Sequence, residues 1–390
     1  MQVRRVAVTG VGVLAACGVG RDDFWSGLLA PQPTEQRRIT GFDPTAFFGN
    51  PKEIKRTDRV VQIALAAADE AMTQAGAVGV DLDRAGVLFG TGVGGLETLE
   101  AQVIVRVEKG ERRVSPFLVP MMMANSSSAA LSMKYGYRGP CETIATACAA
   151  STHAIGNAAR LIATGRCDAM LTGGAEASMT ETALAGFNNM TALSSTGVSR
   201  PFDAERDGFI MSEGAAVLVL EEWSSAEARG ATILAEVLGS ASNADAHHIT
   251  APSPGGTGAI TCMRLALEDA EIDASDVAHI NAHGTSTPLN DAAEAEAIAA
   301  VFGTNGPAVT STKGVTGHAL GAAGALEAAA LVLSMQHGMI PPTDGTKAVD
   351  PALPTIDLVM HDSRPWRPGP SLSNSFGFGG HNGCLVLGPA

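Results

Sequence analysis

Residues 142–165 read ETIATACAASTHAIGNAARLIATG, and residues 308–338 read AVTSTKGVTGHALGAAGALEAAALVLSMQHG. Each segment begins with a short β-prone run, continues through a loop, and ends in an Ala-rich stretch typical of a helix. The loops carry Cys148 and His318, two side chains that are capable of chemistry. The shared order of these parts predicts that one structural unit occurs twice along the chain.

Two further pairs of segments repeat in the same order. One pattern consists of a helical segment, an acidic turn, a strand and a glycine-containing loop, and it occurs at residues 64–92 and 260–284. The other places a glycine turn before an apolar strand, at residues 207–222 and 373–388. Strand-like and Ala-rich helical segments alternate throughout, which indicates an α/β fold.

The bulk composition is that of a globular protein. The 390 residues suffice for two domains or one large two-part fold, and 45% of them are hydrophobic while 17% are charged. Together with the repeats, this predicts two duplicated α/β halves, residues 1–235 and 236–390. The net charge of −14 argues against a nucleic-acid partner, because phosphate binding needs a basic face.

The six cysteines form no CxxC pair and have no regular spacing, which argues against a disulfide framework and against a metal site. We therefore expect reduced thiols, as in a cytoplasmic protein. No apolar stretch is long enough to span a membrane. Five cysteines are expected to pack as small core residues: Cys17, Cys141, Cys167, Cys262 and Cys384.

The N-terminal segment allows two interpretations. Two arginines precede the apolar run VAVTGVGVLAAC at residues 6–17, a combination that also occurs in bacterial lipoprotein signals, with Cys17 as the lipidated residue. The alternative is a first β-strand followed by a turn. We favour the strand, because Gly10 and Gly12 weaken the apolar run.

Cys148 lies where a β-prone run passes into a helix. Unpaired backbone N–H groups and the helix dipole stabilise a thiolate at such a position. The small side chains of Ala147, Ala149 and Ala150 leave room for a substrate. This segment alone fits a nucleophile and a buried structural cysteine equally well.

Two histidines lie on loops after β-prone runs, where a histidine is well placed for chemistry. His283 lies in NAHGTSTP, in which the hydroxyls of Thr285 and Thr287 can bind an amide-bearing arm. His318 lies in the glycine-rich TKGVTGH loop together with Lys313. Glu327 follows in an apolar helix, where a lone carboxylate is costly to bury, so we expect it to pair with Lys313.

Glycines alternate with Phe376 and Phe378 in SNSFGFGGHNG, at residues 373–383. Because glycine tolerates unusual backbone angles, such a loop can bring backbone N–H groups close to a reacting carbonyl. The alternative is a β-turn that the two phenylalanines anchor in the core.

Taken together, these four segments resemble the β-ketoacyl-acyl carrier protein synthases, the condensing enzymes of the thiolase superfamily, and most closely the synthase II type of bacterial fatty acid synthesis. The resemblance runs from the first apolar segment to the last glycine-rich loop. It implies a thiolase-like fold with a five-layer αβαβα core, a homodimer, and no metal or organic cofactor. This sequence has His381 where the family often has threonine, which puts the chain-length preference in doubt.

The resemblance also implies a role for each matching residue. Cys148 matches the nucleophile that accepts the acyl chain, and His283 and His318 match the pair that promotes decarboxylation of a malonyl thioester. The other matches are Lys313 and Glu327 as a supporting charged pair, Phe378 as a gating aromatic whose backbone N–H completes an oxyanion hole, Phe376 and Val93 as substrate-pocket residues, and Thr285 and Thr287 as contacts for the phosphopantetheine arm.

The acyl carrier protein implied by the resemblance is acidic, as is this chain, so docking requires a local basic patch. The segment PKEIKRTDR at residues 51–59 is the strongest candidate. Electrostatic steering of the carrier is expected at Lys52, Lys55, Arg56, Arg59 and Arg200. A solvated helix face is an equally good interpretation of the charge pattern.

Several rival functions fit the sequence less well. A Cys–His hydrolase has no use for a second histidine beside a lysine, and a thiolase carries a second reactive cysteine in the late glycine-rich region. A non-catalytic partner subunit would lack the nucleophile. Two pathways remain open for a condensing acyltransferase: fatty acid synthesis, and type II polyketide synthesis, in which a heterodimer with a non-catalytic ketosynthase-like subunit is an alternative to the homodimer.

Overall fold

Both halves of the chain contribute strands to one continuous sheet. The computed structural model describes residues 3–30, 37–48 and 50–390. The first half contributes β1 (Val6–Ala15), β3 (Ala85–Gly90), β4 (Cys141–Ile144), β5 (Ala169–Glu176) and β6 (Gly214–Glu222). The second contributes β7 (Ala235–Ala244), β8 (His279–Asn281), β9 (Ala308–Thr310), β13 (Ser371–Gly377) and β14 (His381–Gly388).

The spatial order of these strands confirms the predicted duplication. The order is β4-β3-β5-β6-β1 in the first half and β9-β8-β13-β14-β7 in the second. Within each half, the first three strands in this spatial order run parallel to one another. Each of the other two strands runs antiparallel to the strand before it. Residues Ala7 and Val8 of β1 pair with Glu236 and Ala235 of β7, which joins the halves into one continuous sheet.

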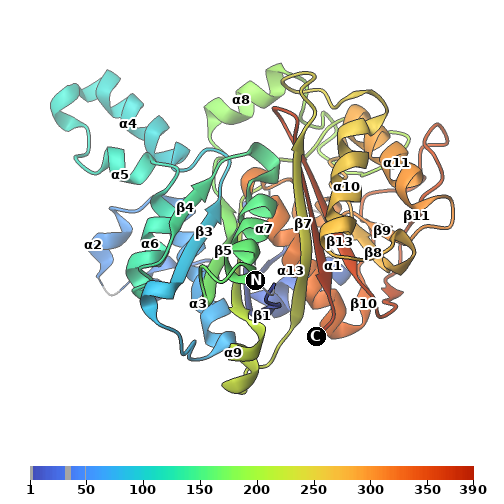
Figure 1. Ribbon diagram of the computed structural model, residues 1–390. Helices are drawn as coiled ribbons and strands as arrows, with labels where there is room; N and C mark the ends of the chain where they lie inside the picture. Colours follow the sequence, from blue (N-terminus) through green and yellow to red (C-terminus); the bar gives the residue numbers. More distant parts are fainter. Residues whose placement is uncertain (1–2, 31–36, 49) are drawn as a thin grey trace.

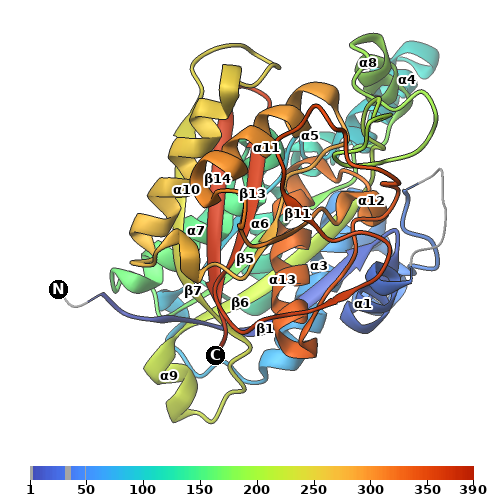
Figure 2. The same cartoon turned by 90° about the vertical axis from the view of Figure 1, so that its right-hand side faces the viewer.

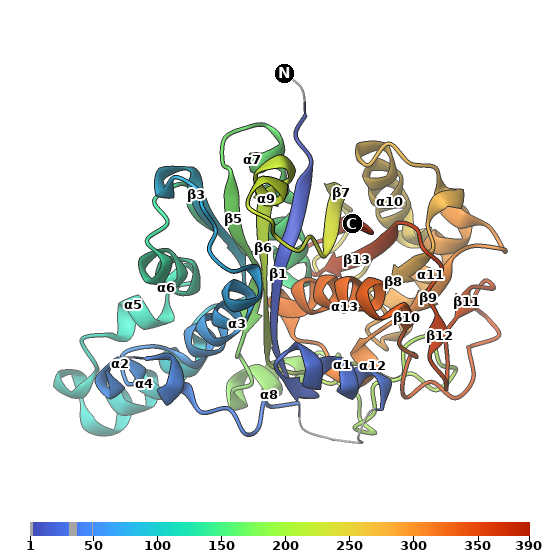
Figure 3. The ribbon, with the colours of Figure 1, turned by 90° about the horizontal axis from the view of Figure 1, so that it is seen from below.

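Helices form three layers around the two half-sheets, in the expected αβαβα order. The outer helices on the first half are α3 (Arg59–Ala75) and α6 (Ser126–Tyr135), and those on the second are α10 (Thr257–Asp269) and α11 (Pro288–Phe302). The central layer is formed by α7 (Ala150–Ala163) and α13 (Ala323–His337), between the half-sheets (Figures 1 and 3). Figure 2 shows α10 lying along β7 and β14.

Small residues make the central layer possible. Every residue of α13 from Ala323 to Ser334 is buried, because the helix packs against sheets on both sides. A Cβ atom on Gly324 would lie 2.0 Å from Oγ1 of Thr152 on α7, so only glycine allows the two helices to approach this closely. This close packing fixes the N-terminal ends of both helices. Cys148 and His318 lie in the segments that lead into these ends.

The remaining helices and strands of the described residues lie around this core. They are β2 (Gly18–Val19), α1 (Arg21–Leu29), α2 (Pro51–Ile54), α4 (Leu96–Lys109), α5 (Leu118–Met122), α8 (Glu181–Asn189), α9 (Trp223–Ala228), α12 (Lys313–Thr316), β10 (Met339–Ile340), β11 (Asp357–Leu358), β12 (Arg364–Pro365) and seven short 3-10 turns. Among the described residues, no helix combines the length and apolar character needed to cross a membrane.

Two expectations for the N-terminal segment and the cysteines can be compared with the structure. Residues Val6–Ala15 of the apolar run after the two arginines form β1 and are all buried, which confirms the strand. The prediction that all five other cysteines are core residues is wrong for Cys141, which is exposed because β4 is the edge strand of its half-sheet. Cys17 is half-buried, and the other three are buried. The division into residues 1–235 and 236–390 stays a prediction.

Candidate active site

Cys148 lies on a tight turn between β4 and α7, as the sequence predicts. The 3-10 turn Ala147–Ala149 bridges the strand and the helix, and Ala147 has φ 50°, in the left-handed region. Such backbone strain is often found at functional sites, where the surrounding fold maintains it. Cys148 is only 7% exposed, so a substrate reaches the sulfur through a pocket.

Burial opposes the thiolate stabilisation that the sequence predicts for Cys148. Burial raises the pKa of Cys148 to about 11, because the charged form loses its hydration. The Lys313 ammonium and the backbone N–H groups of Phe378 and Cys148 lower this pKa, but by less than burial raises it. The helix N-terminus therefore does not suffice to ionise the thiol.

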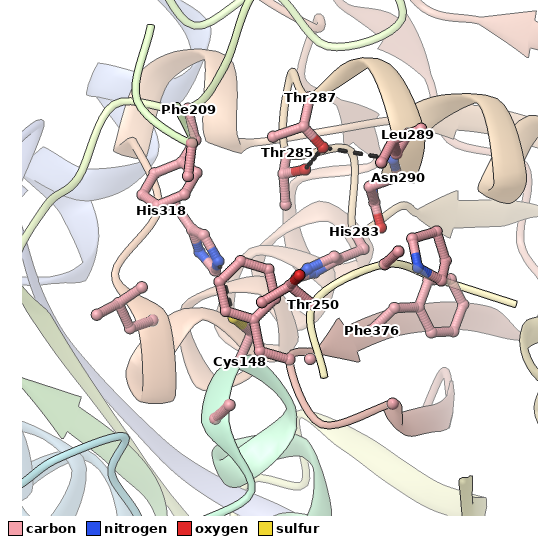
Figure 4. Close-up of a pocket in the computed structure, with 18 of the residues that line it drawn as sticks. Cys148, Phe209, Thr250, His283, Thr285, Thr287, Leu289, Asn290, His318 and Phe376 are labelled. Carbon is pink, nitrogen blue, oxygen red and sulfur yellow. Dashed lines mark hydrogen bonds between the residues drawn. The ribbon is translucent and has the colours of Figure 1, made fainter. Parts of the chain in front are cut away.

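The structure brings the two predicted histidines to this thiol. His318 Nε2 lies 3.1 Å from Cys148 Sγ. The rings of His283 and His318 meet edge to face, with centroids 5.4 Å apart (Figure 4). One ligand atom from each of Cys148, His283 and His318 lies within 4.8 Å of the other two. Cys148 thus converges on one reaction centre with two histidines that lie 135 and 170 positions away in the sequence.

Both imidazoles are neutral at physiological pH. Burial lowers the pKa of His283 and of His318 well below 6.5, and the nearby Lys313 ammonium lowers both further. The predicted ion pair between Lys313 and Glu327 is present, and both side chains are almost fully buried. Burial raises the pKa of Glu327 to about 7 against the opposing effect of Lys313. A neutral imidazole can donate one N–H to a developing anion.

The last glycine-rich loop approaches the nucleophile closely. A Cβ atom on Gly377 would lie 3.1 Å from the backbone nitrogen of Cys148, so a larger residue would push the loop away. The backbone N–H groups of Phe378 and Cys148 both stabilise the thiolate form of Cys148, as expected of two donors that face the sulfur. Phe376 packs edge to face on His283 at a centroid distance of 6.0 Å, which holds this ring.

A cavity of about 480 Å³ leads to these groups. Its walls include the predicted substrate residues Val93, Thr285, Thr287 and Phe376, together with Phe378. The Thr285 and Thr287 hydroxyl oxygens lie 3.0 Å apart, and Thr287 also caps the N-terminus of α11.

The sequence did not reveal several residues of the site. Phe209 packs edge to face on His318, at 5.1 Å between centroids, and Phe187 packs on Phe209. Glu294 is buried on α11 and accepts the backbone N–H groups of His283 and Gly284 at 2.8 and 2.7 Å. The feature that indicated Glu327, a carboxylate within an Ala-rich helix, also occurs at Glu294, so the sequence carried a signal for this residue as well.

The donor atoms of Cys148, His283 and His318 are of the types that Zn²⁺ prefers. In the described part of the chain this is the one cluster of histidine, cysteine and carboxylate side chains close enough to hold a metal ion. The same convergence serves acyl chemistry directly, because it combines a nucleophile with two neutral N–H donors.

Comparison with known families agrees with this chemistry. The family model described as Beta-ketoacyl synthase, N-terminal domain matches residues 31–226, and that described as Beta-ketoacyl synthase, C-terminal domain matches residues 234–347. The chain belongs to the beta-ketoacyl synthase family. Among curated relatives, this synthase is 42% identical to 3-oxoacyl-acyl-carrier-protein synthase 2 of Synechocystis sp. over 99% of this chain and 98% of the relative. It is 41% identical to the enzyme of the same name from Vibrio harveyi over 99% of both chains.

Solved structures give the same fold. The ishigamide ketosynthase/chain length factor superposes on the synthase with a TM-score of 0.92 at 34% identity, covering 100% of both chains. A beta-ketoacyl synthase from Burkholderia phymatum gives 0.91 at 35% identity, covering 99% of this chain and 100% of that one. A ketosynthase in complex with its chain length factor, from Xenorhabdus doucetiae, gives 0.84 at 30% identity, covering 99% and 98%.

The basic residues that the sequence suggests for carrier docking have different environments. Lys52, Lys55 and Arg56 of the synthase are exposed, on and just after α2. Figure 1 places α2 beside α5, and the Arg56 guanidinium lies 4.6 Å from the centroid of the Phe117 ring. These three side chains are available to a partner.

The other two basic residues are already paired within the chain. Arg59 makes an ion pair with buried Glu213, at 2.6 Å between Nη2 and Oε1. Arg200 pairs with Glu205 at 3.2 Å, and its side chain is only 12% exposed. The five-residue patch is thus reduced to three exposed residues.

His381, the departure from the usual family pattern, lies behind the last glycine-rich loop. It begins β14 opposite Gly377, and a Cβ atom on Gly379 would lie 3.0 Å from its Cδ2. The cavity is lined by the neighbouring Gly380 and Asn382, while His381 is not among its lining residues. Its ring therefore contacts the loop and does not line the cavity.

Proposed function

We propose that the synthase joins a malonyl unit to an acyl chain held on Cys148, with loss of carbon dioxide, as a 3-oxoacyl-acyl carrier protein synthase of fatty acid biosynthesis. One observation carries this proposal: the nucleophile and two neutral imidazoles converge within 4.8 Å at the end of a cavity. The sequence relatives support the pathway, since synthase 2 enzymes match at 41–42% identity over 99% of the chain.

Acyl transfer to Cys148 is the first step. The sulfur attacks the carbonyl carbon of an acyl thioester on the carrier, and the bond between that carbon and the carrier sulfur breaks. The thiol proton of Cys148 ends on the departing carrier sulfur. The backbone N–H groups of Phe378 and Cys148 stabilise the oxyanion of the tetrahedral intermediate. Gly377 lets the loop that carries Phe378 lie close to the Cys148 backbone.

Decarboxylation and condensation follow at the same centre. The malonyl thioester loses carbon dioxide, and the electron pair of the broken bond forms an enolate. His283 and His318 each donate one N–H to the enolate oxygen, because their lowered pKa keeps them neutral. The enolate carbon then attacks the acyl carbonyl on Cys148, the carbon–sulfur bond breaks, and the Cys148 thiolate takes up a proton from solvent. These steps use only residues of the chain, the phosphopantetheine arm and this one solvent proton.

The test is the mass of the carrier protein after the synthase is mixed with acyl-carrier and malonyl-carrier. The expected product is a β-ketoacyl carrier whose acyl chain is two carbons longer, and it should be absent with Cys148→Ala. Release of free fatty acid would instead indicate a hydrolase and contradict the proposal.

Type II polyketide synthesis is the second candidate. It is favoured by the solved structures, since two of the three described above are titled as ketosynthases with a chain length factor. The two pathways differ in whether the β-keto group is reduced between rounds. A primer series, with β-keto, β-hydroxy, unsaturated and saturated chains, separates them. Preference for saturated primers supports fatty acid synthesis, and preference for unreduced or unsaturated primers supports a polyketide pathway.

Assembly is proposed as a homodimer through the open edge of the sheet. The edge strand β4 leaves backbone groups unpaired, and nearby α4 and α5 carry the exposed apolar side chains Val103, Ile104, Val107 and Val119. Light scattering of the purified chain tests this. A dimer of the chain alone supports the proposal, and a monomer that pairs only with a ketosynthase-like subunit supports the heterodimer.

A further inference from the structure

The backbone of His318 is held by a neighbouring segment. His318 N–H donates to the Ile210 carbonyl at 2.7 Å, and Ser212 N–H donates to the His318 carbonyl at 3.0 Å. This segment ends at Glu213, whose side chain is 0% exposed. The position of the His318 ring therefore depends on how firmly residues 210–213 are fixed.

Arg59 fixes this segment through Glu213. Its guanidinium donates from Nε to Oε2 at 2.8 Å and from Nη2 to Oε1 at 2.6 Å, a two-bond pairing that defines both position and orientation. Ile39 N–H also donates to Glu213 at 2.7 Å, and Arg59 donates to the Ile39 carbonyl at 3.0 Å. The ion pair thus fastens residues 210–213 to residues 37–39.

Residues 37–39 hold the His318 loop from another side. Arg37 donates from Nη2 to the Gly314 carbonyl at 3.2 Å, in the loop that carries both Lys313 and His318. A Cβ atom on Gly317 would lie 2.8 Å from Arg37 Cγ and 3.0 Å from the Ile210 carbonyl oxygen. The loop before His318 is therefore packed between the two segments that Arg59 and Glu213 join.

We propose that Arg59 and Glu213 are positioning residues for His318, and that Arg59 does not dock the carrier. The inference rests on the proposed function of His318 in decarboxylation. Arg59 begins α3, three residues after the exposed Arg56, so the charge pattern of the sequence does not distinguish the two roles. The buried partner of Arg59, which lies 154 positions away, makes the distinction.

The test compares Arg59→Gln with wild type on malonyl-carrier and on malonyl-pantetheine, a small thioester that needs no docking. We expect kcat for decarboxylation to fall about 10- to 100-fold on both substrates, because small displacements of a catalytic group have effects of this size, with carrier KM unchanged. Arg59→Lys should recover part of the loss. A wild-type kcat on malonyl-pantetheine together with a raised carrier KM would overturn the proposal and return Arg59 to docking.

A matched control is Arg138→Gln, which breaks an Arg–carboxylate pair whose partners are 59% and 64% exposed. It should change neither kcat nor KM. Because Arg59→Gln leaves a buried carboxylate unpaired, Arg59→Gln with Glu213→Gln is the second variant. We expect this folded double variant to show the same loss of kcat, and a wild-type rate in it would also overturn the proposal.

Alkylation of Cys148 by iodoacetamide gives a readout that does not require the proposed reaction. His318 contacts the Cys148 sulfur, so a displaced His318 should slow alkylation of Cys148 several-fold in the Arg59 variants. The measurement uses a Cys141→Ser background, since Cys141 is exposed. If wild type proves inert toward malonyl thioesters, the proposed function fails, and this rate still decides the role of the Arg59–Glu213 pair.

Discussion

At the scale of single residues, burial decides the charge state of the site. It raises the pKa of the Cys148 thiol and lowers the pKa of both histidines, so all three groups are neutral at pH 7. A neutral nucleophile between neutral donors does not repel the malonyl carboxylate or bind it tightly. The Lys313 ammonium, which lies near these three side chains, forms an ion pair with Glu327.

The pH dependence of Cys148 alkylation follows from this burial. Since the pKa of Cys148 is about 11, the thiolate fraction should rise about tenfold per pH unit from pH 7 to 10 without reaching a plateau. Iodoacetamide rates in the Cys141→Ser background measure this. A plateau at or below pH 8 would show that the helix N-terminus and Lys313 outweigh burial.

A buried histidine outside the site predicts acid sensitivity. Burial lowers the pKa of His279 to about 3 from 6.5, so the unfolded chain binds a proton that the folded chain does not between these values. Stability contributed by this residue is therefore present above pH 6.5 and is lost as the pH falls towards 3, by about tenfold in the unfolding constant per unit. Urea unfolding at pH 7 and pH 5 should show a smaller pH effect for His279→Leu. An unchanged difference would contradict this assignment.

At the scale of elements, the contact between the two central helices sets the geometry of the site. Cys148 lies just before α7, and His318 lies in the segment that leads into α13. The N-terminal ends of these two helices are held together where Gly324 meets Thr152. Any widening of this contact separates the groups that must react. Stability and activity are thus linked through the same small residues.

Gly324→Ala tests this link. The added Cβ would lie 2.0 Å from Thr152 Oγ1, so we expect a loss of about 1–3 kcal/mol of stability together with reduced condensation. Gly186→Ala on α8 is the matched control, because nothing lies within 4 Å of its Cβ position, and it should be neutral or slightly stabilising. Equal unfolding free energies for the two variants would refute the role of the helix contact.

Some features of these elements could be predicted from the sequence, and others could not. The duplicated order of strand, loop and helix follows from local patterns, so the two halves and the loops of Cys148 and His318 could be predicted. Phe209 could not, because its contact with His318 arises only when distant segments fold together. The effect of burial on Cys148 could not be predicted for a related reason: a helix N-terminus is visible in sequence, whereas the desolvation of Cys148 is not.

At the scale of the whole molecule, the proposed function requires an acidic enzyme to bind the acyl carrier protein, which the family resemblance implies is acidic as well. With a net charge of −14, long-range repulsion opposes association, and only local positive charge can overcome it. The exposed residues Lys52, Lys55 and Arg56 form such a region beside α5. Arg59 and Arg200 seemed equivalent from charge pattern alone, but their carboxylate partners make them unavailable.

Charge reversal at Lys55 and Arg56 tests carrier docking. The double change to Glu should raise carrier KM about tenfold or more at low ionic strength, and the difference should shrink at high salt as the charges are screened. The kcat should stay unchanged, since neither residue contacts the site. An unaltered carrier KM at low salt would mean that the carrier docks elsewhere.

In the proposed reaction, one site couples decarboxylation to carbon–carbon bond formation through Cys148. The most direct measurement is a single turnover of acylated synthase with malonyl-carrier labelled at both the carboxylate and the methylene carbon. We expect equal amounts of labelled carbon dioxide and labelled β-ketoacyl-carrier with wild type, and no β-ketoacyl-carrier with Cys148→Ala. Labelled carbon dioxide with only acetyl-carrier, or release of the acyl chain as free acid, from correctly acylated wild type would contradict this proposal.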